Sequence, residues 1–258
     1  DLALVKDGPS VRRDYLDDVV VAIDPRADAL FREWDRILKQ RNALLRQVQG
    51  SQPDRLDEST TVTLDVWDDK FNTVGTAVAR ERESLVERLQ PLLQDSYSLL
   101  AAAGPADDGA DGQNVRAVYV RTWGSEPLAA AVAAARRDDL RRGVSTVGPH
   151  RDELELTLND LASRTEASQG EQRTLALALR LAAHRLVTET IGEPPLLLLD
   201  DVLSELDVHR ADALLAHLPP GQTVITSATE LPPATNPDRV LRPGSRDGSP
   251  GFTATSWS

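Results

Sequence analysis

The chain has 258 residues, of which 40% are hydrophobic and 27% are charged, and its formal net charge is −12. This length allows one large domain or two small ones around an apolar core, and the composition is that of an ordinary globular protein. The absence of cysteine excludes disulfides and thiolate metal sites. The longest apolar run, residues 128–135, is too short to span a membrane, and the first residues lack signal-peptide features, so we expect a cytoplasmic protein without a membrane partner.

The charge distribution restricts any binding of DNA. A protein that coats nucleic acid regardless of sequence would be basic, so this acidic chain would have to use a local patch. Residues 114–151 contain seven arginines against three acids. The candidate DNA-binding residues in this segment are Arg136, Arg137, Arg141 and Arg142. The alternative interpretation is a solvated helix face, which is what most charge runs are.

The first part of the chain is predicted to be helical. Residues 10–49 are predicted to be helical, with Ser10 as the candidate N-cap and a break at Asp24–Pro25. After a polar loop, apolar residues recur at three- and four-residue steps over residues 64–99. Two such helices should pack antiparallel, which predicts a helical arm domain over residues 1–112. The aromatic side chains expected in its core are Trp34, Trp67 and Phe71.

The second part of the chain alternates strands and helices. Strands are expected at residues 115–123, 154–158, 196–199 and 223–226. Helices are expected at residues 126–142, 171–191 and 207–217, with a loop at 163–170 and a tail rich in Pro, Gly and Ser. The order helix, buried strand, helix, strand is typical of an α/β unit with a parallel sheet. We therefore predict a second, α/β domain over residues 113–258.

Two acids follow a run of four leucines, Leu196–Leu199. A leucine run without a polar break requires burial on both faces, which predicts a central strand. Carboxylates at the C-terminal end of such a strand lie where open α/β sheets bind ligands. Asp200 is the candidate ligand of a nucleotide-bound Mg²⁺, and Asp201 is the candidate that orients the attacking water. The alternative is a strand end that simply turns at two acids.

The residues SQGEQR at 168–173 open a predicted helix. Ser168 can cap this helix, and Gly170 allows a ligand to approach the backbone closely. The helix N-terminus offers free N–H groups and a positive dipole end, which suit a triphosphate. The alternative is an ordinary cap on a core helix, and the same alternative applies to the turn at Ser204–Asp207.

The order and spacing of these elements resemble the second half of an ABC-type ATPase head, an α/β fold with a P-loop NTPase-like parallel sheet. Four segments further resemble the RecF family: GPSVRRDYLD at 8–17, GPHRD at 148–152, SQGEQRTLAL at 168–177 and LDDVLSELD at 199–207. Transporter, SMC and Rad50-like heads normally have Asp-Glu at the end of the Walker B strand, where this chain has Asp200-Asp201.

The resemblance implies ATP and Mg²⁺ as cofactors, bound between two subunits, with the helical hairpin as an inserted arm. The residues implied to bind nucleotide are Ser168, Gln169, Gly170, Gln172, Arg173, Ser204 and Asp207. The residues implied to be catalytic are Asp200, Asp201 and Thr229, of which Thr229 would sense the γ-phosphate. The resemblance also implies an ATP-dependent homodimer that engages DNA at gaps and single-strand/double-strand junctions, and that promotes RecA loading with RecO and RecR.

One departure from the family pattern is large. No G-x-x-x-x-G-K-[ST] loop occurs in the chain. We expect this Walker A loop and the first strands to precede residue 1 in a longer parent, and the chain alone to be inactive as an ATPase. Two other function classes stay open: a Rad50- or SMC-like head that acts with a nuclease partner, and a non-catalytic module that binds DNA or protein. A longer coiled coil with a zinc hook would indicate the first, and a parent without nucleotide turnover the second.

Overall fold

The structure is a computed structural model that describes residues 2–102, 113–228, 231–232, 235–246 and 249–256. The first half contains α1 (Ala3–Lys6), α2 (Pro9–Ile23), α3 (Ala27–Gln47), η1 (Pro53–Arg55), α4 (Glu58–Ala101), β1 (Val115–Val120) and α5 (Leu128–Arg142). The second half contains η3 (Pro149–Arg151), β2 (Glu153–Leu158), β3 (Leu161–Ala162), α6 (Ser163–Glu166), α7 (Gln169–Ile191), β4 (Leu197–Asp200), η4 (Val202–Glu205), α8 (Val208–Ala216), β5 (Thr223–Thr226), β6 (Arg239–Arg246) and β7 (Ser249–Ser256).

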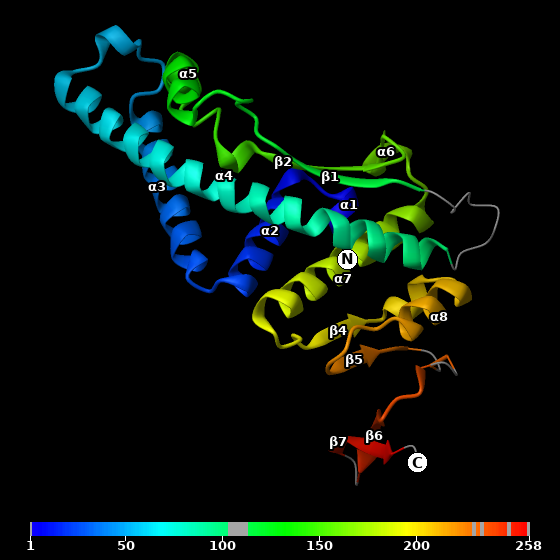
Figure 1. The fold of residues 1–258 in the computed structure, drawn as a ribbon. Helices are drawn as coiled ribbons and strands as arrows, with labels where there is room; N and C mark the ends of the chain where they lie inside the picture. The colour runs from blue at the N-terminus through cyan, green and yellow to red at the C-terminus, as the bar shows by residue number, and fades with distance from the viewer. Residues whose placement is uncertain (1, 103–112, 229–230, 233–234, 247–248, 257–258) are drawn as a thin grey trace.

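Helix α4 is the longest of the described elements and runs through the middle of the molecule (Figure 1). Its first turn is capped by Asp57, whose carboxylate accepts a hydrogen bond from the N–H of Thr60 at 2.8 Å. Its N-terminal half contacts α3 and α5, and its C-terminal half contacts α7 and β1. Apolar side chains at every seventh position of α4 are buried: Leu64, Phe71, Val78, Leu85 and Leu92. This stripe gives one helix a buried face along most of its length.

The predicted pair of long helices is confirmed as α3 and the first half of α4, which lie side by side in Figure 1. The predicted break at Asp24–Pro25 separates α2 from α3. The expectation that Ser10 is the N-cap is wrong: Gly8 is the N-cap of α2, two residues earlier. Pro9 takes the first helical position, where the N–H that proline lacks has no partner within a helix. Of the three aromatic residues expected in the core, Trp34 and Phe71 are buried and Trp67 is partly buried.

The elements before and after residue 112 share one buried core. A single cluster of buried apolar side chains draws members from helices α1 to α5, α7 and α8 and from strands β1, β2 and β4. Helix α4 contributes to it beside both α3 and α7. The division into a domain over residues 1–112 and another over residues 113–258 stays a prediction.

Buried polar contacts, one of them an ion pair, join α2, α4, η3 and β1. Arg82 of α4 donates two hydrogen bonds of 2.7 Å to the carboxylate of Asp17 and one of 2.9 Å to the carbonyl of Pro149. The Tyr119 hydroxyl donates to Asp152 at 2.6 Å. A buried charge is strongly destabilising when its partner is removed, so these contacts fix α2, α4 and η3 relative to one another. They bring together the segments 8–17 and 148–152 that carry the family resemblance.

The described strands form three sheets. Strands β1, β2 and β3 are antiparallel, β4 and β5 are parallel, and β6 and β7 form an antiparallel hairpin. The parallel pair was predicted, whereas the tail was not expected to contain strands and the loop at 163–170 was not expected to contain α6. Among the described helices, none combines the length and the apolar character needed to cross a membrane.

The expectation that the leucine run is buried on both faces is wrong. Leu197 and Leu199 are buried, but Leu198 is 65% exposed and Leu196 is 52% exposed. The neighbouring strand β5 shows Val224 on the same open face, at 42% exposure. The physical reason is that helices cover only one face of this two-stranded sheet within the described residues, so alternate side chains meet solvent.

The burial of His150 in η3 leads to a prediction about pH. Burial lowers the pKa of this imidazole from 6.5 to about 4, and the ring lies 6.0 Å from Trp34 and 6.1 Å from Phe71 between centroids. The folded state therefore favours the neutral ring. The free energy of unfolding therefore keeps its full value above pH 6.5. It falls by up to roughly 3 kcal/mol as the pH drops from 6.5 towards 4, because the unfolded chain takes up the proton more readily than the folded chain. Urea unfolding measured across this range should show a smaller pH slope for His150→Gln than for the unmodified chain, and equal slopes would contradict the assignment.

Candidate nucleotide site

The two candidate acids lie together at the exposed end of the parallel sheet. Strands β4 and β5 are in a register that places Asp200 opposite Thr226. The Thr226 hydroxyl donates to Oδ1 of Asp200 at 2.5 Å. The backbone N–H of Asp201 donates to the same hydroxyl at 3.0 Å and to the Thr226 carbonyl at 3.2 Å. Both carboxylates are exposed, so a ligand can reach them at the C-terminal edge of the sheet, as the sequence predicted.

Asp201 has an unusual backbone conformation. Its φ of 51° lies in the left-handed region, which is uncommon for residues other than glycine. The hydroxyl of Ser204 donates to the Asp201 carbonyl at 2.8 Å. Leu203, in the same turn, is buried in the core. The turn after β4 is therefore anchored on both its polar and its apolar side.

The predicted cap at the start of α7 is present as a complete capping box. The Ser168 hydroxyl accepts from the N–H of Glu171 at 3.3 Å, and the Glu171 carboxylate accepts from the N–H of Ser168 at 2.8 Å. Ser168 and Gln169 are exposed, and Gly170 is partly exposed. The loop thus presents a helix N-terminus to solvent, an arrangement that suits an anionic ligand.

Gln172 and Arg173 are placed differently from the exposed part of this loop. The Gln172 side chain is buried, and its amide donates to the carbonyls of Ser163 at 3.0 Å and Arg164 at 3.1 Å. These two bonds direct the Gln172 amide hydrogens at α6, and the expected contact of this residue with nucleotide stays a prediction. Arg173 is partly exposed at the edge of the loop.

Arg210 lies close both to Gly170 at the start of α7 and to Asp207 before α8, a neighbourhood that sequence reasoning missed. Asp207 caps α8 by accepting from the N–H groups of His209 and Arg210, and it pairs with the Arg210 guanidinium at 3.1 Å. A Cβ added at Gly170 would lie 3.2 Å from Nη1 of Arg210. The spacing of Asp207 and Arg210, three residues apart at a helix start, is the sequence signal that could have predicted their ion pair.

The donor set at Asp200 fits a nucleotide-bound Mg²⁺. One carboxylate oxygen accepts from Thr226, and the other has no hydrogen bond within the described part of the chain. Among the described residues no three His, Cys, Asp or Glu side chains gather to hold a metal. Mg²⁺ bound mainly by phosphate and water needs only one or two carboxylates, so the residues suit a metal that arrives with nucleotide. Thr229, the predicted sensor of the γ-phosphate, lies outside the described residues.

The predicted arginine patch on α5 is partly neutralised. Arg136 pairs with Asp65 and Asp68 of α4, and Arg141 pairs with Asp138 at 3.0 Å. The remaining two candidates, Arg137 and Arg142, are exposed and have no ion pair within the described residues.

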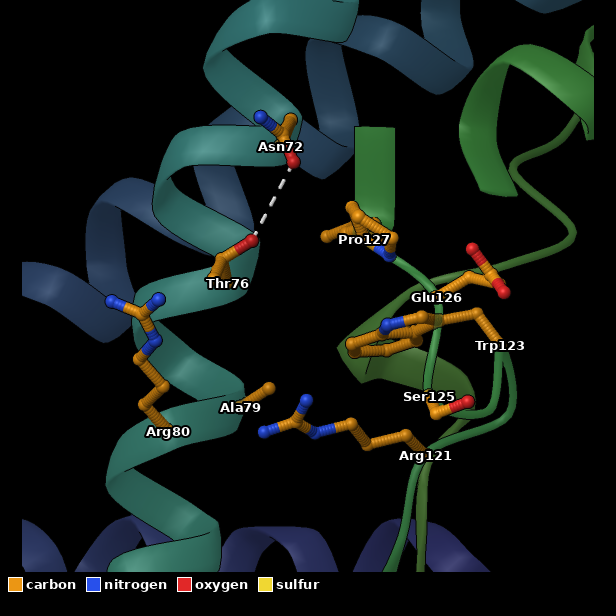
Figure 2. Close-up of a pocket in the computed structure, with 10 residues that line it drawn as sticks. Asn72, Thr76, Ala79, Arg80, Arg121, Trp123, Ser125, Glu126 and Pro127 are labelled. Carbon is orange, nitrogen blue, oxygen red and sulfur yellow. Dashed lines mark hydrogen bonds between the residues drawn. The ribbon is translucent and has the colours of Figure 1, made fainter. Parts of the chain in front are cut away.

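A hollow of about 370 Å³ lies between α4 and the loop that precedes α5 (Figure 2). Arg80, Arg121 and Trp123 line it. The Arg121 guanidinium lies 6.0 Å from the centre of the Trp123 ring and pairs with Glu83. None of the residues predicted to bind nucleotide lines this hollow, so it is separate from the candidate nucleotide site.

The fold and the arrangement of these loops define the class of protein: the chain has the fold of an ABC-type ATPase head. Two solved structures agree, both of the recombination mediator protein RecF in the RecFOR pathway. The match to the structure named RecF-ATP covers 98% of this chain and 65% of the RecF chain, with a TM-score of 0.79 and 26% identity. The match to the structure named RecF-ATPrS covers 97% of this chain and 65% of the RecF chain, with a TM-score of 0.79 and 27% identity.

Curated relatives show the family. The DNA replication and repair protein RecF of Paenarthrobacter aurescens (strain TC1) is 37% identical over 96% of this chain and 69% of its own length. The RecF of Synechococcus sp. (strain JA-2-3B'a(2-13)) is 35% identical over 90% of this chain and 60% of its own length. No protein-family model matches the chain. The chain belongs to the RecF family, and it spans about 60% of the length of the Synechococcus relative.

The buried position of Gln172 leads to a test against its exposed neighbour. Gln172→Leu should destabilise the fold by about 1–3 kcal/mol, because the carbonyls of Ser163 and Arg164 lose their donor in a buried place. Gln169→Leu, one turn earlier and exposed, should change the free energy of unfolding by less than about 0.5 kcal/mol. Chemical denaturation of both variants measures the difference, and equal effects would show that Gln172 does not anchor α6.

Proposed function

We propose that this chain is the part of a RecF-type ATPase of DNA replication and repair that carries the signature loop, the Walker B strand and the D-loop turn. The observation that carries the proposal is the exposed carboxylate pair at the end of β4, with Asp200 held by Thr226. Membership of the RecF family and the likeness to RecF bound to ATP support the same assignment.

In this proposal, nucleotide is bound between two subunits. Asp200 would hold Mg²⁺, which neutralises phosphate charge when it is bound. Asp201 would accept a hydrogen bond from the attacking water. Ser168, Gln169 and Gly170, with Arg173 at the edge of the loop, would contact the γ-phosphate held by the other subunit. Asp207 would lie at the dimer interface, where its ion pair with Arg210 couples that interface to the signature loop. Thr229 would sense the γ-phosphate.

The proposal assigns the β-phosphate to a Walker A lobe that this chain does not contain. No P-loop sequence occurs in its 258 residues, so the chain alone should bind ATP weakly and hydrolyse none. The complete protein would act in the cytoplasm on DNA gaps and single-strand/double-strand junctions, and it would promote RecA loading together with RecO and RecR.

Two other functions compete with this proposal. A Rad50-like head with a nuclease partner is disfavoured by the short arm, in which α3 ends at Gln47 and α4 begins at Glu58, and by the lack of cysteine for a zinc hook. A non-catalytic binding module would be indicated if the full-length protein lacked ATP turnover that depends on Asp200 and Asp201.

Ser168→Arg in the full-length protein should prevent ATP-driven dimerisation. The arginine would occupy the space expected for the γ-phosphate of the opposite subunit. Because Ser168 also caps α7, the matched comparison is Ser168→Ala, which loses the cap, at a cost of about 1 kcal/mol, and the hydroxyl expected to contact the γ-phosphate, but adds no bulk. Sedimentation with ATP should give monomers for the arginine variant, whereas the alanine variant should still form dimers, at higher protein concentration than the unmodified protein. ATP-dependent dimers of Ser168→Arg would contradict the proposed interface.

Arg137 and Arg142, which have no ion pair with any residue that the structure describes, should contribute more to DNA binding than the paired Arg136 and Arg141. Arg137→Ala with Arg142→Ala should weaken DNA affinity and reduce the slope of log affinity against log salt by about 2, because two phosphate contacts are lost. Arg136→Ala with Arg141→Ala removes the same formal charge, but these arginines already pair with acids, so a smaller effect is expected. Titrations at several salt concentrations distinguish the pairs, and a larger loss for the second pair would contradict the proposed patch.

A further inference from the structure

We infer that Thr226 and Ser204 are positioning residues that hold the two acids in different ways. Thr226 leaves Oδ2 as the oxygen of Asp200 that faces the metal, and the two hydroxyls together fix the peptide of Asp201. This inference rests on the proposed ATPase function. In this inference neither hydroxyl needs to touch the nucleotide. Ser204, which the family resemblance implies to be a nucleotide contact, is instead assigned to holding the backbone of Asp201.

The hydrogen-bond pattern sets the direction of the Thr226 hydroxyl. The N–H of Asp201 can only donate, so the Thr226 oxygen accepts from it at 3.0 Å. The single hydrogen of the hydroxyl then goes to Oδ1 of Asp200, and the separation of 2.5 Å is typical of a hydroxyl bound to a carboxylate. Oδ1 uses one of its two lone pairs for this bond, while Oδ2 has no hydrogen bond within the described residues. The bond restrains rotation of the carboxylate and leaves Oδ2 as the oxygen with both lone pairs available to a metal.

The backbone of Asp201 is held from both sides. A left-handed conformation costs an L-residue roughly 1–2 kcal/mol, so it persists only when neighbouring groups stabilise it. Thr226 binds the N–H of Asp201, and the Ser204 hydroxyl donates to its carbonyl at 2.8 Å. With both peptide groups held, the direction in which the Asp201 side chain leaves the backbone is set. Ser204 makes no hydrogen bond to the Asp200 carboxylate among the described contacts.

The two hydroxyls can therefore be separated by experiment. In the full-length protein, Mn²⁺ serves as the probe for the metal, and its affinity in the presence of a non-hydrolysable ATP analogue is measured by electron paramagnetic resonance. Thr226→Val keeps the side-chain shape and removes the hydroxyl. It should weaken Mn²⁺ affinity about tenfold, as expected for the loss of a hydrogen bond to a charged group. Thr226→Ser should restore the affinity to within about twofold of the unmodified protein.

Ser204→Ala should behave differently from Thr226→Val. Mn²⁺ affinity should stay within about twofold of the unmodified protein, because Asp200 keeps its partner. The turnover number should fall about tenfold at an unchanged KM for ATP, because the Asp201 carbonyl loses the hydrogen bond from Ser204. Thermal unfolding of each variant checks that the fold is retained.

The controls separate this inference from the function on which it rests. Asp200→Ala should abolish nucleotide-dependent Mn²⁺ binding, and if it does not, the Walker B assignment itself is wrong. If Asp200→Ala abolishes binding but Thr226→Val does not weaken it, the role of Thr226 is overturned. Failure of Thr226→Ser to restore affinity would also overturn it, since the hydroxyl would then not be the group that matters. Equal loss of Mn²⁺ affinity in Ser204→Ala and Thr226→Val would overturn the division of roles.

Discussion

The arrangement of the molecule follows from the need of helix α4 to cover an apolar stripe along nearly its whole length. A helix of 44 residues with buried side chains from Leu64 to Leu100 cannot leave that stripe in water. The helices α3 and α5 cover its first half, and α7 with β1 covers its second half. Helix α7, which carries the candidate nucleotide loop at its N-terminus, therefore packs on the same long helix that forms the hairpin with α3.

Polar contacts fix how these elements sit on α4, where apolar packing alone would allow sliding. Arg82, in the middle of the helix, joins Asp17 and the carbonyl of Pro149. Nearer the tip, Arg41 of α3 bonds to Asp68 and Asp139, each at 2.7 Å. Each guanidinium has carboxylate and carbonyl or hydroxyl partners at fixed angles, so a shift of one helix turn would leave buried charges unpaired. The motif residues at 8–17 and 148–152 thus have a structural reason for their identity in this chain.

The sequence predicted those parts of the fold and of the site that depend on local order. The helix break at Asp24–Pro25, the cap at Ser168 and the acids after β4 follow from neighbouring residues. Thr226 could not be recognised in this way, because its contact with Asp200 depends on the register of two strands and spans 26 positions. The ion pair of Arg136 with Asp65, 71 positions away, could not be predicted either, because it depends on how α5 packs against α4.

Predictions of burial from the sequence pattern also failed where burial depends on residues outside the segment. The leucine run before Asp200 predicted a strand correctly but not the exposure of Leu198, because burial of the second face depends on which elements cover it. Gln172 and Gln169 are the same residue type three positions apart, yet one faces α6 and the other faces solvent. Composition and spacing do not distinguish the two.

The open face of the β4–β5 sheet has a consequence for the colloidal behaviour of this chain in solution. Leu196, Leu198 and Val224 form an apolar surface on a sheet whose outer strand edges have no partner strand among the described residues. At low ionic strength, the net charge of −12 keeps copies of the chain apart. Added salt shortens the range of that repulsion to about 10 Å at 0.1 M, while the attraction between apolar faces persists. Salt that stabilises many proteins in storage will therefore promote clustering of this one, and dilute, low-salt buffers will keep it dispersed.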